Sequence, residues 1–182
     1  QVVADSGLHY HILRASWFYQ NFSEGFLRGM IEADEVALPC GDTPEPFIDA
    51  GDIAAAAVRC LTDPDIAAGL YEVTGPHLLT FKQCIGQIGT ITGQPLSFVD
   101  LSVDAMVDAL TSAGVERDMV WLMGHLFSEV LDGRNSHTTD TLEKLLGRAP
   151  VSFSEYANRA FAASSAEATF SKLSHIEEGA GQ

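Results

Sequence analysis

Apolar residues along this chain follow two periods, one typical of strands and one typical of helices. Short β-branched or alternating segments between turn residues predict strands at 9–14, 69–76 and 96–100. Apolar residues three or four positions apart predict helices at 19–32, 53–61, 80–91, 104–113, 116–131, 140–146 and 152–163. Strands alternate with helices in the first part of the chain, and helices alone follow. We therefore predict an α/β fold with parallel strands, crossover helices and a helical cap.

Capping residues mark where several of these helices begin. Thr80 is followed by Gln83, and Ser152 by Glu155, with the spacing of a capping box. In this motif two side chains satisfy backbone N–H groups that the first helical turn leaves free. Asp52 is the N-cap residue that we expect for the helix that follows it.

The segment 9–22 joins a predicted strand to a cluster of aromatic residues. A turn at 6–7 precedes the strand, and aromatic residues then surround the polar Ser16 and Gln20. Open α/β sheets bind ligands at the carboxyl ends of their strands, and small-molecule pockets are apolar with a few polar groups. We therefore interpret this segment as a candidate ligand site. A buried strand followed by an amphipathic core helix explains the same pattern and stays open.

The charge of the chain limits the kinds of molecule that it is expected to bind. The chain has 182 residues and a formal charge of −15, from 25 acidic and 10 basic residues, which disfavours binding to nucleic acid or anionic membranes. No apolar run is long enough to span a bilayer, and the first residues lack a signal-peptide layout. Cys40, Cys60 and Cys84 are odd in number and widely spaced, which favours free thiols and a cytoplasmic location. We expect a small-molecule substrate, and a homodimer stays open.

The two ends of the sequence differ from its middle. Residues 1–7 look like the last turn of a helix that closes at Gly7, with no helix start before them. We therefore expect that the sequence begins within a domain. Residues 174–182 are small and polar, and we expect them to be disordered.

Five segments occur in an order that points to one family. They are 12–22, 39–42, 47–54, 71–80 and 145–153. Together they resemble the C-terminal half of the NmrA-like atypical short-chain dehydrogenases. This group includes triphenylmethane reductase-like and ergot-alkaloid reductase-like NAD(P)-dependent oxidoreductases. The resemblance covers about residues 5–160.

The resemblance implies the C-terminal part of a Rossmann-like parallel sheet with a helical substrate-binding subdomain, and NADP or NAD as the cofactor. It divides the chain into part of the cofactor-binding domain at 1–100, a helical cap at 101–164 and a flexible tail at 165–182. The glycine-rich loop that binds the pyrophosphate in such folds is missing from the sequence. Its nearest imitation, Gly86 with Gly89, lies inside a predicted helix, so we reject it as a phosphate loop.

The resemblance also assigns residues to the two ligands. Beside the nicotinamide it places Ala15, Ser16, Trp17 and Phe18. It assigns Trp17, Asn21 and Phe22 to the side that faces the substrate. Because the cofactor carries the chemistry of hydride transfer, the protein needs only to orient the reactants and exclude water.

The implied function is an NAD(P)-dependent oxidoreductase that transfers hydride to an apolar aromatic or conjugated small molecule. The alternative is an NAD(P)-sensing regulatory protein that has no enzymatic activity and acts through a protein partner. This alternative arises because Tyr156 is not followed by a lysine four residues later, so the Tyr-x-x-x-Lys pair of ordinary short-chain dehydrogenases is absent. Many members of the family lack this pair, and the catalytic residues stay unassigned.

Three other patterns have structural explanations that we favour. His9 and His11 share one face of a strand, but no third ligand is near in sequence, so we expect no metal site. Asp49 and Asp52 could form an acid–base pair, but a turn and a helix cap explain them. The Met- and Phe-containing stripe at 119–131 is expected to pack in the core rather than line a pocket.

Overall fold

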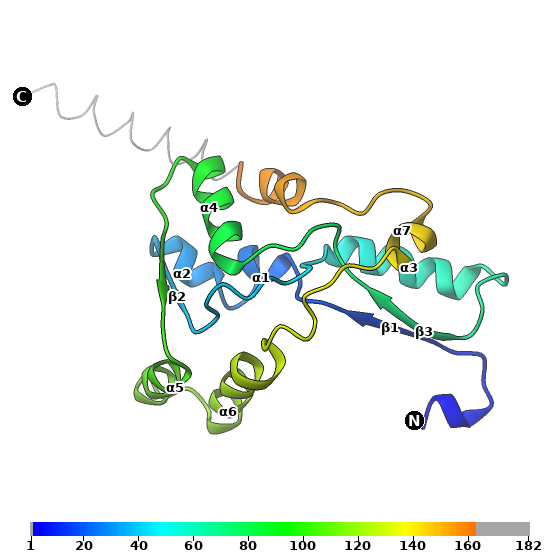
Figure 1. Ribbon diagram of the computed structural model, residues 1–182, viewed down its shortest axis with the longest axis horizontal. Helices are drawn as coiled ribbons and strands as arrows, with labels where there is room; N and C mark the ends of the chain where they lie inside the picture. Colours follow the sequence, from blue (N-terminus) through cyan, green and yellow to red (C-terminus); the bar gives the residue numbers. More distant parts are fainter. Residues whose placement is uncertain (1, 163–182) are drawn as a thin grey trace, which may run out of the picture.

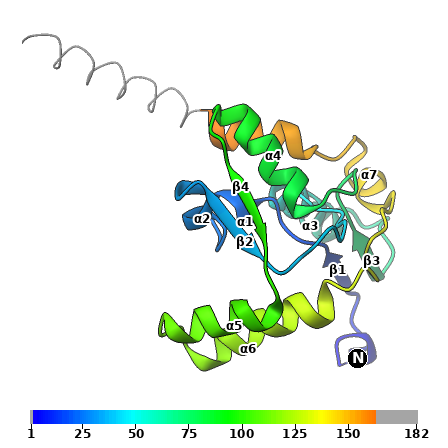
Figure 2. The same cartoon turned by 60° about the vertical axis from the view of Figure 1, so that its left-hand side comes forward.

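Short strands form two parallel pairs in the computed structural model, which describes residues 2–162 (Figure 1). β1 (His11–Ala15) pairs with β3 (Gly69–Val73), and β2 (Glu35–Leu38) pairs with β4 (Ser97–Asp100). The predicted strands and their parallel direction are confirmed. β2 adds a strand at an apolar run that the sequence alone left unassigned. Figure 2 shows β2 and β4 side by side.

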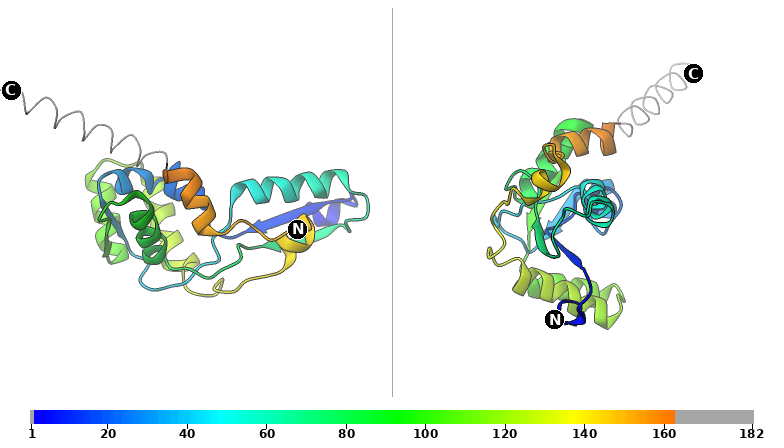
Figure 3. Two further views of the ribbon diagram at one scale, coloured as in Figure 1. Left: turned by 90° about the horizontal axis from the view of Figure 1, so that it is seen from above. Right: turned by 90° about the vertical axis from the view of Figure 1, so that its right-hand side faces the viewer.

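Helices cover these strands on several sides. α3 (Ala50–Thr62) lies along the β1–β3 pair and packs on α7 (Thr141–Leu146), as Figure 3 shows. α4 (Phe81–Thr92) precedes β4, whereas α5 (Val103–Ser112) follows it and packs beside α6 (Arg117–His125). A further helix covers residues 153–162. The chain is therefore a mixed α/β fold, as predicted.

The single helix that the sequence predicts at 19–32 is wrong. The structure has two short helices there, α1 (Gln20–Ser23) and α2 (Arg28–Glu32). Between them the chain folds back tightly at Gly25, where an added Cβ would lie 2.8 Å from the Cα atom of Asn21. Only glycine fits this approach, so the apolar period continues while the helix does not.

The helix predicted at 116–131 is only partly α-helical. α6 ends at His125, and a π-helical turn, η2 (Leu126–Val130), follows it. π-Helical turns are rare and are frequent at functional sites. This turn carries Phe127 into the core, so the prediction that the stripe packs there is confirmed for its buried members Val120, Phe127 and Leu131. It is wrong for Leu126 and Val130, which line a pocket.

The N-cap predicted for α3 is wrong by three residues. Asp49, not Asp52, caps the helix: its backbone is extended and its Oδ1 accepts a hydrogen bond of 2.8 Å from the N–H of Gly51. Asp52 lies in the first turn and accepts hydrogen bonds from the Arg148 guanidinium and from the N–H of Val151, at 2.5 and 2.7 Å. These partners are about a hundred residues away in sequence, so local signals could not reveal them.

Other predicted helix ends are confirmed. Thr80 and Gln83 form a reciprocal capping box at the start of α4, which ends at Gly93 with φ of 69°. Ser152 and Glu155 hydrogen-bond each other at the start of the helix over 153–162. In both places the residues that satisfy the free N–H groups are neighbours in sequence, which is why the signal is readable.

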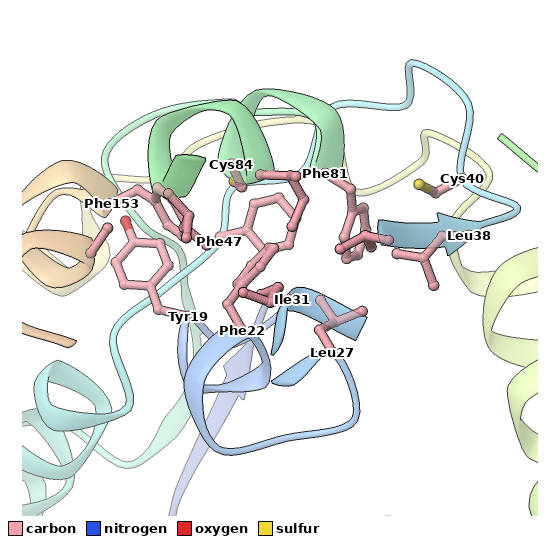
Figure 4. Packing of buried hydrophobic residues seen from close by; sticks show 14 of the residues in the cluster. Tyr19, Phe22, Leu27, Ile31, Leu38, Cys40, Phe47, Phe81, Cys84 and Phe153 are labelled. Carbon is pink, nitrogen blue, oxygen red and sulfur yellow. The ribbon is translucent and has the colours of Figure 1, made fainter. Parts of the chain in front are cut away.

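Aromatic rings from distant segments meet in the main core (Figure 4). Phe47 lies between Phe22 and Phe81, with ring centroids 5.5 and 4.9 Å apart, and Phe153 packs against Phe22 at 5.2 Å. The core thus joins α1, α4 and the helix over 153–162. The division into parts at 1–100, 101–164 and 165–182 stays a prediction, and the predicted tail, including 174–182, lies outside the described residues.

Three further features concern the protein's environment. Within residues 2–162, no helix combines the length and hydrophobicity needed to cross a bilayer. Cys40, Cys60 and Cys84 are buried free thiols, as predicted. Residues 2–162 contain no group of side chains that could hold a metal ion. His9 and His11 stack edge to face, and the ring of His11 forms a hydrogen bond with the carbonyl of Ile66.

We predict that Asp52→Asn lowers the free energy of unfolding by about 1–3 kcal/mol, because the new amide group would place N–H donors against donors of Arg148 or Val151. Urea denaturation measures the change. The matched control is Glu32→Gln, which removes the same charge from an exposed pair with Arg28 and should cost much less stability than Asp52→Asn. Equal effects of the two variants would contradict a structural role for Asp52.

Candidate functional site

A pocket of about 430 Å³ opens at the carboxyl ends of β1 and β3. Its wall comes from segments 14–18, 45–46 and 72–74, together with Asn21, Leu126, Val130 and Asn135. Most of the exposed surface inside it is apolar. The pocket therefore lies where parallel α/β sheets bind ligands, and it has the composition of a small-molecule site.

The loop after β1 is held by hydrogen bonds to a second segment. The N–H of Ile48 donates to the carbonyl of Trp17 at 2.9 Å, and the N–H of Tyr19 donates to the carbonyl of Ile48 at 2.8 Å. The hydroxyl of Ser16 donates to the carbonyl of Pro46. Because backbone and side chain are both engaged, the loop has a fixed shape without any ligand.

Most residues that the sequence assigned to the site lie together in the pocket wall. Ala15, Ser16, Trp17, Phe18 and Asn21 all line it. Trp17 is half-buried, and its ring packs at 5.5 Å from Phe81 and 5.7 Å from Phe127. The aromatic segment thus contributes directly to the pocket, and its neighbours in the core fix its orientation.

Phe22 is placed elsewhere. Its side chain is fully buried and is not part of the pocket wall, because it faces the rings of Phe47 and Phe153 in the core. One helical turn separates it from Phe18, which is 42% exposed. The structure therefore places Phe22 behind the pocket, where it supports the wall.

The carboxylates of Asp49 and Asp52 have structural partners. Asp49 accepts hydrogen bonds from the side-chain amide of Gln20 at 3.0 Å and from the guanidinium of Arg159 at 2.6 Å. Gln20 in turn accepts a bond from the N–H of Ala50 at 3.0 Å. Neither aspartate lines the pocket, so both have structural roles, but not the ones predicted: Asp49 caps α3, and Asp52 binds Arg148 and Val151.

Glu45 is a pocket residue that the sequence did not reveal. Its side chain is 1% exposed, and within the described part of the chain neither carboxylate oxygen has a hydrogen-bond partner. The pKa of Glu45 is raised to about 7, mainly by burial and also by the nearby charge of Asp132, while His137 acts in the opposite direction. The only local signal was an acidic residue between two prolines, Pro44 and Pro46, which is also typical of an exposed turn.

No family model matches the sequence, but individual proteins do. The NAD(P)H azoreductase of Xenophilus azovorans is 29% identical over 157 residues, which cover 86% of this chain and 54% of that protein. An uncharacterized oxidoreductase of Bacillus subtilis, YesF, is 31% identical over 80% of this chain and 51% of its own length. The agroclavine dehydrogenase of Claviceps fusiformis is 29% identical, over 82% and 53%.

Solved structures agree with these sequence relatives. The NADPH complex of a quinone oxidoreductase from Escherichia coli matches with a TM-score of 0.78 at 24% identity, over 88% of this chain and 56% of that one. The triphenylmethane reductase of a Citrobacter species matches with a TM-score of 0.75 at 20% identity, over 87% and 55%. The chain is similar to these reductases in sequence and in fold, in agreement with the predicted resemblance to NmrA-like atypical short-chain dehydrogenases.

The structural likeness shows that the chain has a Rossmann-like fold. The chain spans about half the length of the curated relatives it matches. Their activities are therefore evidence for a proposal about this chain. Gly86 and Gly89 lie inside α4. They do not form a phosphate-binding loop, as the sequence predicted.

Gly75 brings the end of β3 against the second segment of the pocket. Its N–H donates to the carbonyl of Pro46 at 3.0 Å, and an added Cβ would lie 1.7 Å from the carbonyl oxygen of Phe47. We predict that Gly75→Ala destabilises the chain by about 3 kcal/mol or more, because the backbone must separate. Thermal unfolding measures this change.

The control for that variant is Gly86→Ala, on the exposed face of α4 with open space at its Cβ. It should stabilise the chain by about 0.5–1 kcal/mol through helix propensity. A neutral effect of Gly75→Ala would show that the close approach at Phe47 is not needed for folding.

We predict that the stability of the chain depends on pH through Glu45. A folded pKa of about 7, above the ordinary value of 4.5 for a glutamate, means that the contribution of Glu45 is fully present below pH 4.5 and is lost as the pH rises through 7. Glu45→Gln removes this titration. The free energy of unfolding of the variant minus that of the native chain should therefore rise by roughly 2 kcal/mol between pH 5 and pH 8. Urea denaturation at several pH values tests this, and a constant difference would contradict it.

Proposed function

We propose that this chain supplies the substrate side of an NAD(P)H-dependent oxidoreductase that transfers hydride to apolar aromatic or conjugated molecules. The observation that carries the proposal is the pocket at the carboxyl ends of β1 and β3, with Trp17 in its wall. An aromatic wall of fixed orientation binds flat, conjugated molecules by stacking or edge contacts. Hydride transfer requires this orientation and the exclusion of water.

The pocket fits the nicotinamide end of such a cofactor. Segment 15–18 offers apolar surface for a flat ring, and the side chains of Asn21 and Asn135 offer hydrogen-bond donors and acceptors for a carboxamide. When bound, the reduced nicotinamide supplies the hydride. We propose that these residues hold the nicotinamide. The glycine-rich loop that binds the pyrophosphate is not in this sequence.

The relatives support a reductase of this class. Those matched include an NAD(P)H azoreductase and an agroclavine dehydrogenase, and the solved structures include an NADPH-dependent quinone oxidoreductase and a triphenylmethane reductase. A conjugated or aromatic acceptor is common to these names. A cytoplasmic location and a homodimer belong to the same proposal and need separate measurements.

The test compares the two tryptophans of the chain. Trp17→Ala should raise KM for a quinone and for an azo dye about tenfold, because the pocket loses its largest aromatic contact. Steady-state oxidation of NADPH and of NADH, read by absorbance, measures the change. Trp121→Ala is the control: Trp121 is 67% exposed, stacks on His125 and lies outside this pocket, so KM should not change.

Two outcomes would overturn the proposal. If no acceptor in a panel of quinones, imines and dyes oxidises the cofactor when the complete protein is assayed, the enzymatic function fails. Cofactor binding without oxidation, seen in a fluorescence titration with NADPH and NADH, would then favour the NAD(P)-sensing alternative. Equal effects of Trp17→Ala and Trp121→Ala would show that this pocket is not the acceptor site.

A further inference from the structure

Glu45 is fixed in place by its backbone neighbours on both sides. Its own N–H and carbonyl form a two-bond antiparallel bridge with Leu79, at 2.9 and 3.0 Å. The carbonyl of Pro44 accepts a hydrogen bond of 2.6 Å from the hydroxyl of Ser136, and the carbonyl of Pro46 accepts bonds from Ser16 and from Gly75. The Cα atom of Glu45 therefore cannot move away to carry the carboxyl group into solvent.

The buried carboxyl group has no internal task in the fold. The other buried carboxylates, those of Asp49 and Asp52, are each bonded to an arginine and to a backbone N–H group. Within residues 2–162, the two oxygens of Glu45 have no such partner. A buried, unpaired polar group costs stability, and it is most readily explained where a ligand supplies the missing partner.

The proposed reaction needs a group of this kind. When an acceptor with a C=O, C=N or N=N bond takes a hydride from the reduced cofactor, its π bond breaks and the electron pair moves to the oxygen or nitrogen atom. That atom must then gain a proton, so that one hydride and one proton are added in total. Among the polar side chains in the pocket wall, a neutral carboxyl group is the strongest acid at neutral pH.

We propose that Glu45 is the proton donor of this reductase, and that its neutral carboxyl group protonates the heteroatom of the acceptor as hydride arrives. The O–H bond of Glu45 breaks as the new O–H or N–H bond forms, and the carboxylate regains a proton from water after the product leaves. This inference rests on the proposed hydride transfer. It adds a catalytic residue that the family resemblance did not assign.

The electrostatic surroundings of Glu45 support this role. Its burial disfavours the charged form, and Asp132 acts in the same direction, whereas His137 opposes it when protonated. The imidazole of His137 lies 3.2 Å from a carboxylate oxygen of Glu72, which also lines the pocket. Glu45 therefore keeps its proton to a higher pH than an ordinary glutamate does.

The test uses two classes of acceptor at pH 6. An azo dye needs a proton together with the hydride, whereas a triarylmethane cation becomes a neutral product by gaining hydride alone. Glu45→Gln should lower kcat for the azo dye about 100-fold and leave kcat for the cation within about threefold. Glu143→Gln, on the exposed face of α7, is the matched control and should change neither value.

The other outcomes would overturn the inference in different ways. Equal losses for both acceptors would indicate a structural role for Glu45, and no loss for either would exclude any role. Native protein that reduces neither class would instead refute the proposed function. Infrared difference spectra of native protein against Glu45→Gln give a readout without turnover: absence of a protonated carboxyl band at pH 6 would overturn the inference by itself.

Discussion

The pocket depends on the hydrogen bonds that fasten residues 16–19 to residues 46–48. Trp17 and Tyr19 exchange backbone bonds with Ile48, while the carbonyl of Pro46 accepts from both Ser16 and Gly75. These bonds hold the ends of β1 and β3 and the intervening segment at one edge of the sheet. Because buried backbone groups are costly to leave unpaired, the pocket keeps its shape without a ligand, as orientation-dependent chemistry requires.

One short aromatic segment serves both the pocket and the core. Trp17 and Phe18 face the pocket, whereas Tyr19 and Phe22 are buried in the aromatic cluster. The sequence offered a ligand site and a core helix as alternatives for this segment, and the structure contains both. The segment switches from pocket-facing to core-facing side chains where the extended loop turns into α1, because successive side chains there point in different directions. The ring of Phe81 touches Trp17 on one side and Phe22 on the other, so the core supports the pocket wall directly.

Sequence reasoning succeeded where the partners are neighbours in the chain. The capping box at Thr80 follows from adjacent residues, and the parallel strands were predicted from the alternation of strands and helices. Five of the six residues assigned through the family resemblance line the pocket, and their roles toward nicotinamide and substrate stay a proposal. Sequence reasoning failed where the deciding contact is distant. Gly25 breaks a helix through a close backbone approach, and Asp52 bonds partners near residue 150 instead of capping α3. Glu45 could not be found at all, because only the fold buries an acidic residue between two prolines.

The burial of Glu45 lowers the stability of the fold when the carboxyl group is charged, and it favours the neutral acid that the proposed reaction needs. The same desolvation that raises its pKa makes the charged form costly to the fold, so the folded chain favours the neutral form that holds a proton. A glutamine would relieve this cost and keep the shape of the pocket, but it would remove the acid. An unpaired carboxyl group that the fold buries at a cost, beside a pocket whose other polar groups are weaker acids, is thus better explained by chemistry than by stability.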